Sequence, residues 1–157
     1  MNNQTIQKFN VIGISTRTIN TNGQSAIDIE ALWQKFWEGK ILNKIPNKIS
    51  SDIFAIYTDY ETNFTGYYTT IIGLSVSTLD EIPEQMIGIT IDTNVYHKIV
   101  SKGKMPNSIG KTWLDIWADK ELDSKRAYNA DFTVHGIKYN DGDHAEVETY
   151  LSVRQSV

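Results

Sequence analysis

The fold is decided by two stretches of sequence, LWQKFW at residues 32–37 and WLDIW at residues 113–117. With Ile29, the apolar residues of the first stretch recur at i, i+3, i+4, i+7 and i+8, which is one face of an α-helix. The second stretch repeats the pattern, and its tryptophans lie 80 residues after those of the first (33 to 113 and 37 to 117). This fixed offset predicts a duplicated unit with one helix in each half.

Strands surround both predicted helices. Runs of β-branched and aromatic residues with period-2 alternation predict strands over residues 9–15, 53–58, 68–76, 86–91, 128–136 and 147–153. Ser25 is a candidate cap for the first helix, and Asn140–Asp143 predicts a hairpin between the last two strands. The order is therefore β-α-β-β twice, in halves of about 8–78 and 85–157.

These elements predict an α+β fold over a single domain, residues 1–157. In such a fold each half gives a helix and strands to one antiparallel sheet, with the helices covering one face. The other face of the sheet needs cover as well, and we expect a ligand groove there.

Composition excludes several classes of protein. The chain has no cysteine, which excludes disulfides, thiolate zinc sites and a cysteine nucleophile. Its net charge of −4 argues against direct binding of nucleic acid or an anionic membrane. The N-terminal residues do not form a signal sequence, and no apolar run approaches the ~20 residues of a membrane span. We expect a cytoplasmic monomer.

Catalytic signatures are absent: there is no phosphate loop, nucleophile elbow, zinc-protease helix or dinucleotide fingerprint. His144, Glu146 and Glu148 alternate along one strand in a spacing that a metal site could use, but a solvated strand face explains them better. Residues 140–143 hold too few ligands for a calcium loop. The sequence predicts no metal and no cofactor.

An excess of aromatic residues is the remaining unusual feature. Tyr57, Tyr60 and Tyr68 lie close in sequence, and the helices add four tryptophans. Such a set can line a pocket for lipophilic cations, which gain ~0.5–2 kcal/mol from each ring face. Each residue also has a structural alternative, because helical aromatics usually pack in the core and Glu61 can be an ordinary loop acid.

The chain resembles the GyrI-like small-molecule-binding domains, in particular the stand-alone effector-binding proteins of integron cassettes and the ligand domains of AraC-type regulators. The motifs that carry the resemblance are Val11–Ile14 with Thr16–Thr18, Leu32–Phe36, Tyr57–Asn63, Gly66–Thr69 with Ile72–Gly73, Trp113–Trp117, and Arg126–Tyr128 with Asp131–Phe132. Their order and spacing, more than any one motif, make the match specific.

The resemblance implies binding of lipophilic, often cationic compounds. It also implies a Glu-x-Tyr motif after the Asp-Phe pair, where this chain has Thr133 and His135. Threonine offers a hydrogen bond but no charge, so we expect weaker preference for cations unless Glu61 or Glu148 reaches the pocket. Some relatives use the missing glutamate and tyrosine to hydrolyse strained-ring compounds, which argues against an enzyme here.

We therefore expect a non-catalytic domain that binds a hydrophobic, aromatic and in some cases cationic ligand. The expected ligand-binding residues are Trp33, Phe36, Tyr57, Tyr60, Glu61, Tyr68, Trp113, Trp117, Phe132, Thr133 and His135. Two alternatives stay open. One is a regulator that acts through a protein partner, such as a transcription regulator or DNA gyrase, since the chain has no room for a helix-turn-helix. The other is an enzyme with His135 or Glu61 as its base.

Overall fold

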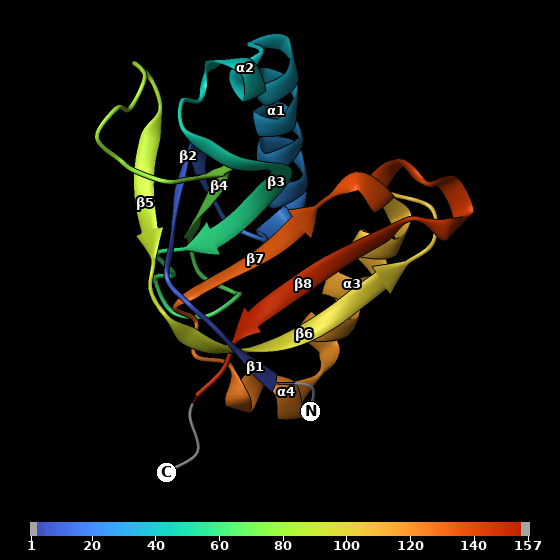
Figure 1. The fold of residues 1–157 in the computed structure, drawn as a ribbon. Coiled ribbons are helices and arrows are strands. Elements are labelled where there is room, and N and C mark those ends of the chain that lie inside the picture. Colours follow the sequence, from blue (N-terminus) through green and yellow to red (C-terminus); the bar gives the residue numbers. More distant parts are fainter. Residues whose placement is uncertain (1–2, 155–157) are drawn as a thin grey trace.

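Eight antiparallel strands form one curled sheet in the computed structural model, which describes residues 3–154 (Figure 1). Residues 1–2 and 155–157 of the predicted domain lie outside the described part. The strands are β1 (Asn3–Ile6), β2 (Phe9–Thr18), β3 (Lys48–Thr58), β4 (Tyr68–Val76), β5 (Ile87–Ile91), β6 (Asn94–Lys102), β7 (Ala130–His135) and β8 (Glu146–Ser152). Their order in the sheet is β1-β6-β8-β7-β3-β4-β2-β5.

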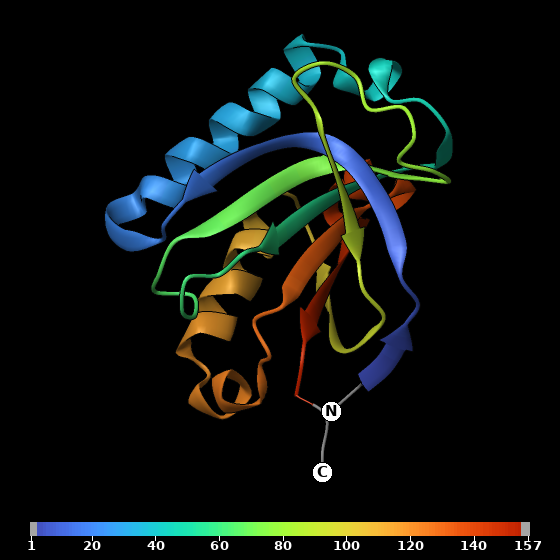
Figure 2. The same cartoon turned by 90° about the vertical axis from the view of Figure 1, so that its left-hand side faces the viewer.

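The two predicted helices lie on the same side of this sheet (Figure 2). They are α1 (Gln24–Glu38) and α3 (Asn107–Ala118). The structure adds two short helices, α2 (Ile41–Lys44) and α4 (Lys120–Lys125), and the 3₁₀ turns η1 (Thr21–Gly23), η2 (Ile137–Asn140) and η3 (Gly142–His144). Within residues 3–154, none of the helices is long and apolar enough to cross a membrane. The α+β class, the antiparallel sheet and the helices on one face are confirmed.

Strand pairing gives the two halves the same topology. In the first half β4 lies between β2 and β3, and in the second β8 lies between β6 and β7. The β3–β7 pair joins the halves at the centre of the sheet. The first strand of the second half is therefore β6, which the sequence analysis missed. The predicted strand at 86–91 exists as β5, but it pairs with β2 of the first half.

Both faces of the sheet are packed. On the helix face, Leu32 and Phe36 of α1 lie against Ile12, Ile72 and Leu74. The opposite face is covered because the sheet curls over it. There a second core is formed by Val11, Ile56, Ile71, Ile91, Tyr96, Phe132 and Tyr150. This face has no room for the ligand groove that the sequence analysis placed on it.

Two local expectations differ from the structure. Gly23, in the left-handed conformation at φ 72°, occupies the cap position of α1, so Ser25 lies inside the helix and does not cap it. Residues 140–143 do not form a tight hairpin, because the connection between β7 and β8 spans residues 136–145 and contains η2 and η3. Both differences leave polar groups beside the space between the helices.

Candidate functional site

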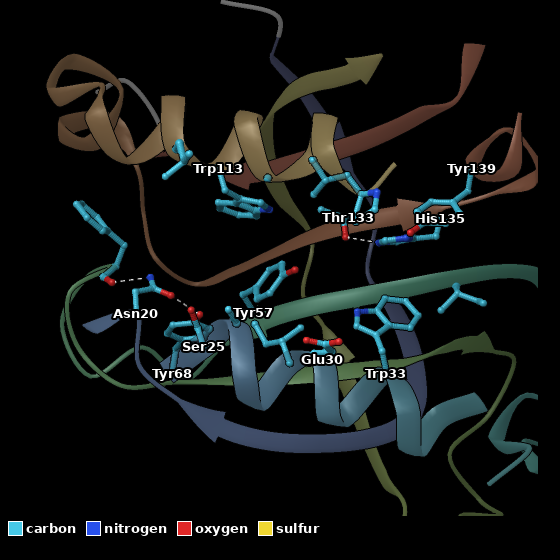
Figure 3. A pocket seen from close by; sticks show the side chains of 18 of the residues that line it. Asn20, Ser25, Glu30, Trp33, Tyr57, Tyr68, Trp113, Thr133, His135 and Tyr139 are labelled. Atoms are coloured by element: carbon cyan, nitrogen blue, oxygen red, sulfur yellow. Dashed lines mark hydrogen bonds between the residues drawn. The ribbon is translucent and has the colours of Figure 1, made fainter. Parts of the chain in front are cut away.

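A groove of about 1060 Å³ lies on the helix face of the sheet, between α1 and α3 (Figure 3). Its position follows from the duplication, because each half supplies one helix and the two helices stand apart over the centre of the sheet. A groove of this size is just above the range of about 300–1,000 Å³ that is usual for small-molecule sites.

Strands β3 and β7 form the floor. Side chains alternate between the faces of a strand, so Ile53 and Tyr57 of β3 point to the groove together with Thr133 and His135 of β7. Ile53 lies opposite His135 in the register of the two strands. The floor therefore combines two rings with a hydroxyl and an aliphatic side chain.

The helices form the walls. Trp33 and Trp37 of α1 line one wall, and Trp113 and Trp117 of α3 line the other. All four tryptophans of the chain thus border the groove. One end is formed by the loop that carries Phe64, whose ring stacks on that of Trp117 at 6.3 Å between centroids.

Eight of the eleven predicted site residues line this groove. They are Trp33, Tyr57, Tyr60, Tyr68, Trp113, Trp117, Thr133 and His135. The structure brings them together from two helices, three strands and the loop after β3.

The other three predicted site residues do not line the groove. Phe36 is fully buried beneath α1, because it lies on the stripe of the helix that faces the sheet. Phe132 precedes Thr133 on β7 and so points to the opposite face, where its ring stacks on Tyr150 at 4.9 Å. Glu61 is an exposed loop residue whose N–H donates to the carbonyl of Tyr67.

A buried ion pair between Arg126 and Asp131 closes the end of the groove that Tyr60 lines. Asp131 Oδ2 accepts hydrogen bonds from Arg126 Nη2 at 2.7 Å and from the Tyr60 hydroxyl at 2.6 Å. Asp131 Oδ1 accepts from the backbone N–H and the hydroxyl of Ser152. Both charges are at most 1% exposed, and each neutralises the other. Asp131 therefore fixes the end of the groove and has no free charge to offer a ligand.

The titratable groups of the floor are held neutral. Burial raises the pKa of the Tyr57 hydroxyl far above its ordinary value. Burial lowers the pKa of His135 to about 4, so its ring carries no charge at neutral pH. A hydrogen bond of 2.9 Å joins His135 Nε2 to Thr133 Oγ1. The neutral form of His135 does not repel a cation.

Glu30 of α1 is the main wall residue that the sequence analysis missed. Its exposed carboxylate borders the groove, and no side chain within residues 3–154 forms an ion pair with it. Helical spacing gave a signal for it, because Glu30 lies three residues before Trp33 and so on the same side of the helix. Glu148 does not reach the groove, because it pairs with Lys98 on the other face.

Further lining residues were missed as well, among them Asn20, Phe64 and Tyr139. Asn20 joins two parts of the wall, accepting from the Tyr68 hydroxyl at 2.6 Å and donating to the carbonyl of Phe64 at 2.8 Å. These residues come from loops and a 3₁₀ turn, which carry no periodic pattern that would assign them to a face.

The alternating acids of β8 are engaged in ion pairs. Glu146 pairs with Lys138 and Lys102, as Glu148 does with Lys98. Among residues 3–154, no group of three or more histidine and acidic side chains is placed to hold a metal ion. The groove itself offers ring faces, one hydroxyl–imidazole pair and the carboxylate of Glu30.

Comparisons with known proteins agree with this geometry. The chain is 26% identical over 148 residues to the putative transcriptional regulator protein YobU of Bacillus subtilis (strain 168). The aligned stretch covers 91% of each chain. Its fold is similar to that of the integron cassette protein VCH_CASS2 from the mobile metagenome of Vibrio cholerae, at a TM-score of 0.75 and 27% identity over 98% of this chain and 95% of the other.

SAV2435, whose structure was solved bound to tetraphenylphosphonium, shares the fold at a TM-score of 0.80 and 12% identity, over 97% of this chain and 92% of the other. The family of integron-associated effector binding proteins, Cass2, matches residues 4–153. The match spans both halves of the sheet and every wall of the groove, and the resemblance drawn from the sequence motifs is thereby confirmed. The chain belongs to the Cass2 family of integron-associated effector binding proteins.

Proposed function

We propose that this protein binds hydrophobic, aromatic small molecules in the groove between α1 and α3 and does not transform them. The observation that carries the proposal is the groove itself, an unfilled space of about 1060 Å³ walled by all four tryptophans and floored by Tyr57 and His135. Ring faces and apolar walls favour an aromatic guest through burial, at ~25 cal/mol per Å², and through ring stacking.

The chemistry of the floor supports binding without turnover. Tyr57 and Tyr60 have raised pKa values because they are buried, and Tyr60 also donates to Asp131. His135 has a pKa of about 4, well below the range in which an imidazole serves as a base at neutral pH. The relatives add support, since the family is one of effector-binding proteins and one structural neighbour holds tetraphenylphosphonium.

Intrinsic fluorescence tests the proposal directly, because every tryptophan of the chain borders the groove. We expect tetraphenylphosphonium and neutral aromatic dyes to change the emission in a saturable way. Trp113→Leu should weaken that binding, whereas Tyr67→Leu, which removes an exposed ring outside the groove, should not. Silence across a broad panel of aromatic compounds, in protein with a folded circular dichroism spectrum, would refute the proposal.

A protein partner is the second candidate for how binding is used. Trp37 and Leu114 line the groove and are 55% and 63% exposed, so apolar surface continues from the groove to the outside. A relative described as a putative transcriptional regulator agrees with such a role. Pull-down with and without an aromatic ligand tests it. The cytoplasmic location and the monomeric state stay predictions.

A further inference from the structure

The floor of the groove has a ring near each end and the small side chain of Thr133 between them. In the register of β3 and β7, Ala55 lies opposite Thr133, two residues from Tyr57 on one side and two from Ile53 on the other. Ala55 and Thr133 are both 1% exposed. Four residues along a strand span ~13 Å, so the level of Tyr57 and the level of Ile53 and His135 are about that far apart.

The first ring cluster, the tyrosine cage, consists of Tyr57, Tyr68 and Trp113. The ring of Tyr57 meets that of Trp113 edge to face at 5.2 Å and that of Tyr68 at 6.2 Å between centroids. An edge-to-face contact covers one face of one of the two rings, and all three side chains line the groove. Figure 3 shows these three side chains gathered at one end of the groove.

The second ring cluster, the histidine cage, consists of Trp33, His135 and Tyr139. The imidazole of His135 lies 5.0 Å from the ring of Trp33 and 5.0 Å from that of Tyr139, measured between centroids. Among the described residues, no ring contact joins this cage to the tyrosine cage. The groove thus has two separate clusters of rings.

The middle of the groove is polar on two sides. Glu30 lies between Tyr57 and Trp33 on the side of α1, and Thr133 lies on the side of β7 (Figure 3). The carboxylate of Glu30 has no ion partner within residues 3–154, and the other charged lining residue, Arg126, is neutralised by Asp131. A positive or hydrogen-bonding group is therefore best placed in the middle, away from both cages.

We infer that the groove is a two-site receptor for elongated ligands, in which two aromatic groups joined by a flexible cationic linker occupy the tyrosine cage and the histidine cage together. The linker lies over Thr133, between the two cages, and its charge faces Glu30. This inference rests on the proposed function and adds the class of ligand to it. Joining two rings raises affinity because the second ring binds as part of the same molecule.

Three probes test the inference by isothermal titration calorimetry. Bis(3-phenylpropyl)ammonium carries two rings on a linker whose extended length matches the spacing of the cages, 3-phenylpropylammonium carries one ring, and bis(3-phenylpropyl) ether has two rings and no charge. We expect the two-ring cation to bind about tenfold tighter than the one-ring cation, since a buried ring contact contributes up to about one power of ten.

Substitutions separate the two cages. Trp33→Leu and Trp113→Leu each remove one cage wall and keep an apolar side chain, and Tyr67→Leu removes an exposed ring outside the groove as the control. Each groove variant should weaken the two-ring cation about threefold to tenfold. The one-ring cation should lose less than twofold in either variant, because the intact cage still accepts it. The control should change neither.

Two results would overturn the inference and leave the proposed function standing: equal affinity for the one-ring and two-ring cations, or loss of two-ring binding in only one of the two tryptophan variants. Failure of all three probes to bind, together with silence of the fluorescence panel, would instead overturn the proposed function. The comparison of probes uses the unaltered protein, so it decides the matter even where a variant fails to fold.

Discussion

Glu30→Gln removes the unpaired carboxylate of the groove wall and keeps the size and shape of the side chain. We expect this change to lower the affinity for bis(3-phenylpropyl)ammonium and to leave the affinity for the corresponding ether unchanged. The expected loss of affinity is small, because Glu30 is an exposed residue and solvent screens its charge. Exposed ion pairs contribute about 0.2–1 kcal/mol, which corresponds to a loss of about 1.4-fold to fivefold.

Salt dependence distinguishes this mechanism from a change in shape. The screening length falls from about 30 Å at 0.01 M salt to about 3 Å at 1 M. The difference between the Glu30→Gln variant and the unaltered protein should therefore be largest at low salt and vanish at 1 M. Calorimetric titration of the cation and the ether at both salt concentrations measures it.

Glu38→Gln is the matched control. Glu38 is an exposed acid of the same helix that does not line the groove, so its removal changes the net charge of the protein by the same amount. The reasoning is refuted if Glu38→Gln weakens cation binding as much as Glu30→Gln does, since the overall field would then be responsible. It is also refuted if Glu30→Gln weakens the cation and the ether equally.

Three further substitutions test the packing around the groove. Asp131→Asn leaves the buried Arg126 guanidinium without its carboxylate and should lower the free energy of unfolding by about 3–5 kcal/mol in urea titrations; an unchanged midpoint would contradict the role of the pair. Phe132→Ala should cost about 3–5 kcal/mol in the same assay but leave ligand affinity intact in the folded protein, and lost affinity would return Phe132 to the site. The pKa of His135 is about 4 in the folded protein and about 6.5 in the unfolded chain, so between these two values only the unfolded chain takes up the proton. The stability that the neutral imidazole contributes is therefore present above pH 6.5 and is lost as the pH falls toward 4. His135→Gln should flatten that part of a plot of urea midpoint against pH, and an unaltered plot would contradict the assignment.

The helices were predictable because their signal is local. The spacing of Leu32, Trp33, Phe36 and Trp37 is set by the helix itself, and α1 spans Gln24–Glu38 as the pattern indicates. The same holds for α3 and for most strands. Strand β6 escaped detection because its sequence, NVYHKIVSK, mixes polar and apolar residues on both faces. Its partners β1 and β8 lie far away in sequence, and only the folded sheet shows the pairing.

Two errors in the site could have been avoided by applying strand and helix geometry to each residue. Phe132 and Thr133 are neighbours on a strand, so they cannot both point into one groove. Phe36 lies four residues after Leu32 and so shares its sheet-facing stripe, whereas Trp33 is rotated by about 100° from Leu32 and borders the groove. The aromatic character of a residue therefore predicted that it is important, and only its place in the element predicted which side it faces.

The position of Glu30, the unpaired acid of the groove, has the largest consequence for function. Thr133 occupies a floor position that is 1% exposed, where a carboxylate would be shielded from water and would attract a cation strongly. This chain has a neutral hydroxyl there and carries its unpaired charge at Glu30, on an exposed helix surface. A charge in that position acts weakly, so the ring faces and the length of the groove are left to decide which molecules bind. Selection in this groove should therefore depend on the shape of a ligand more than on its charge.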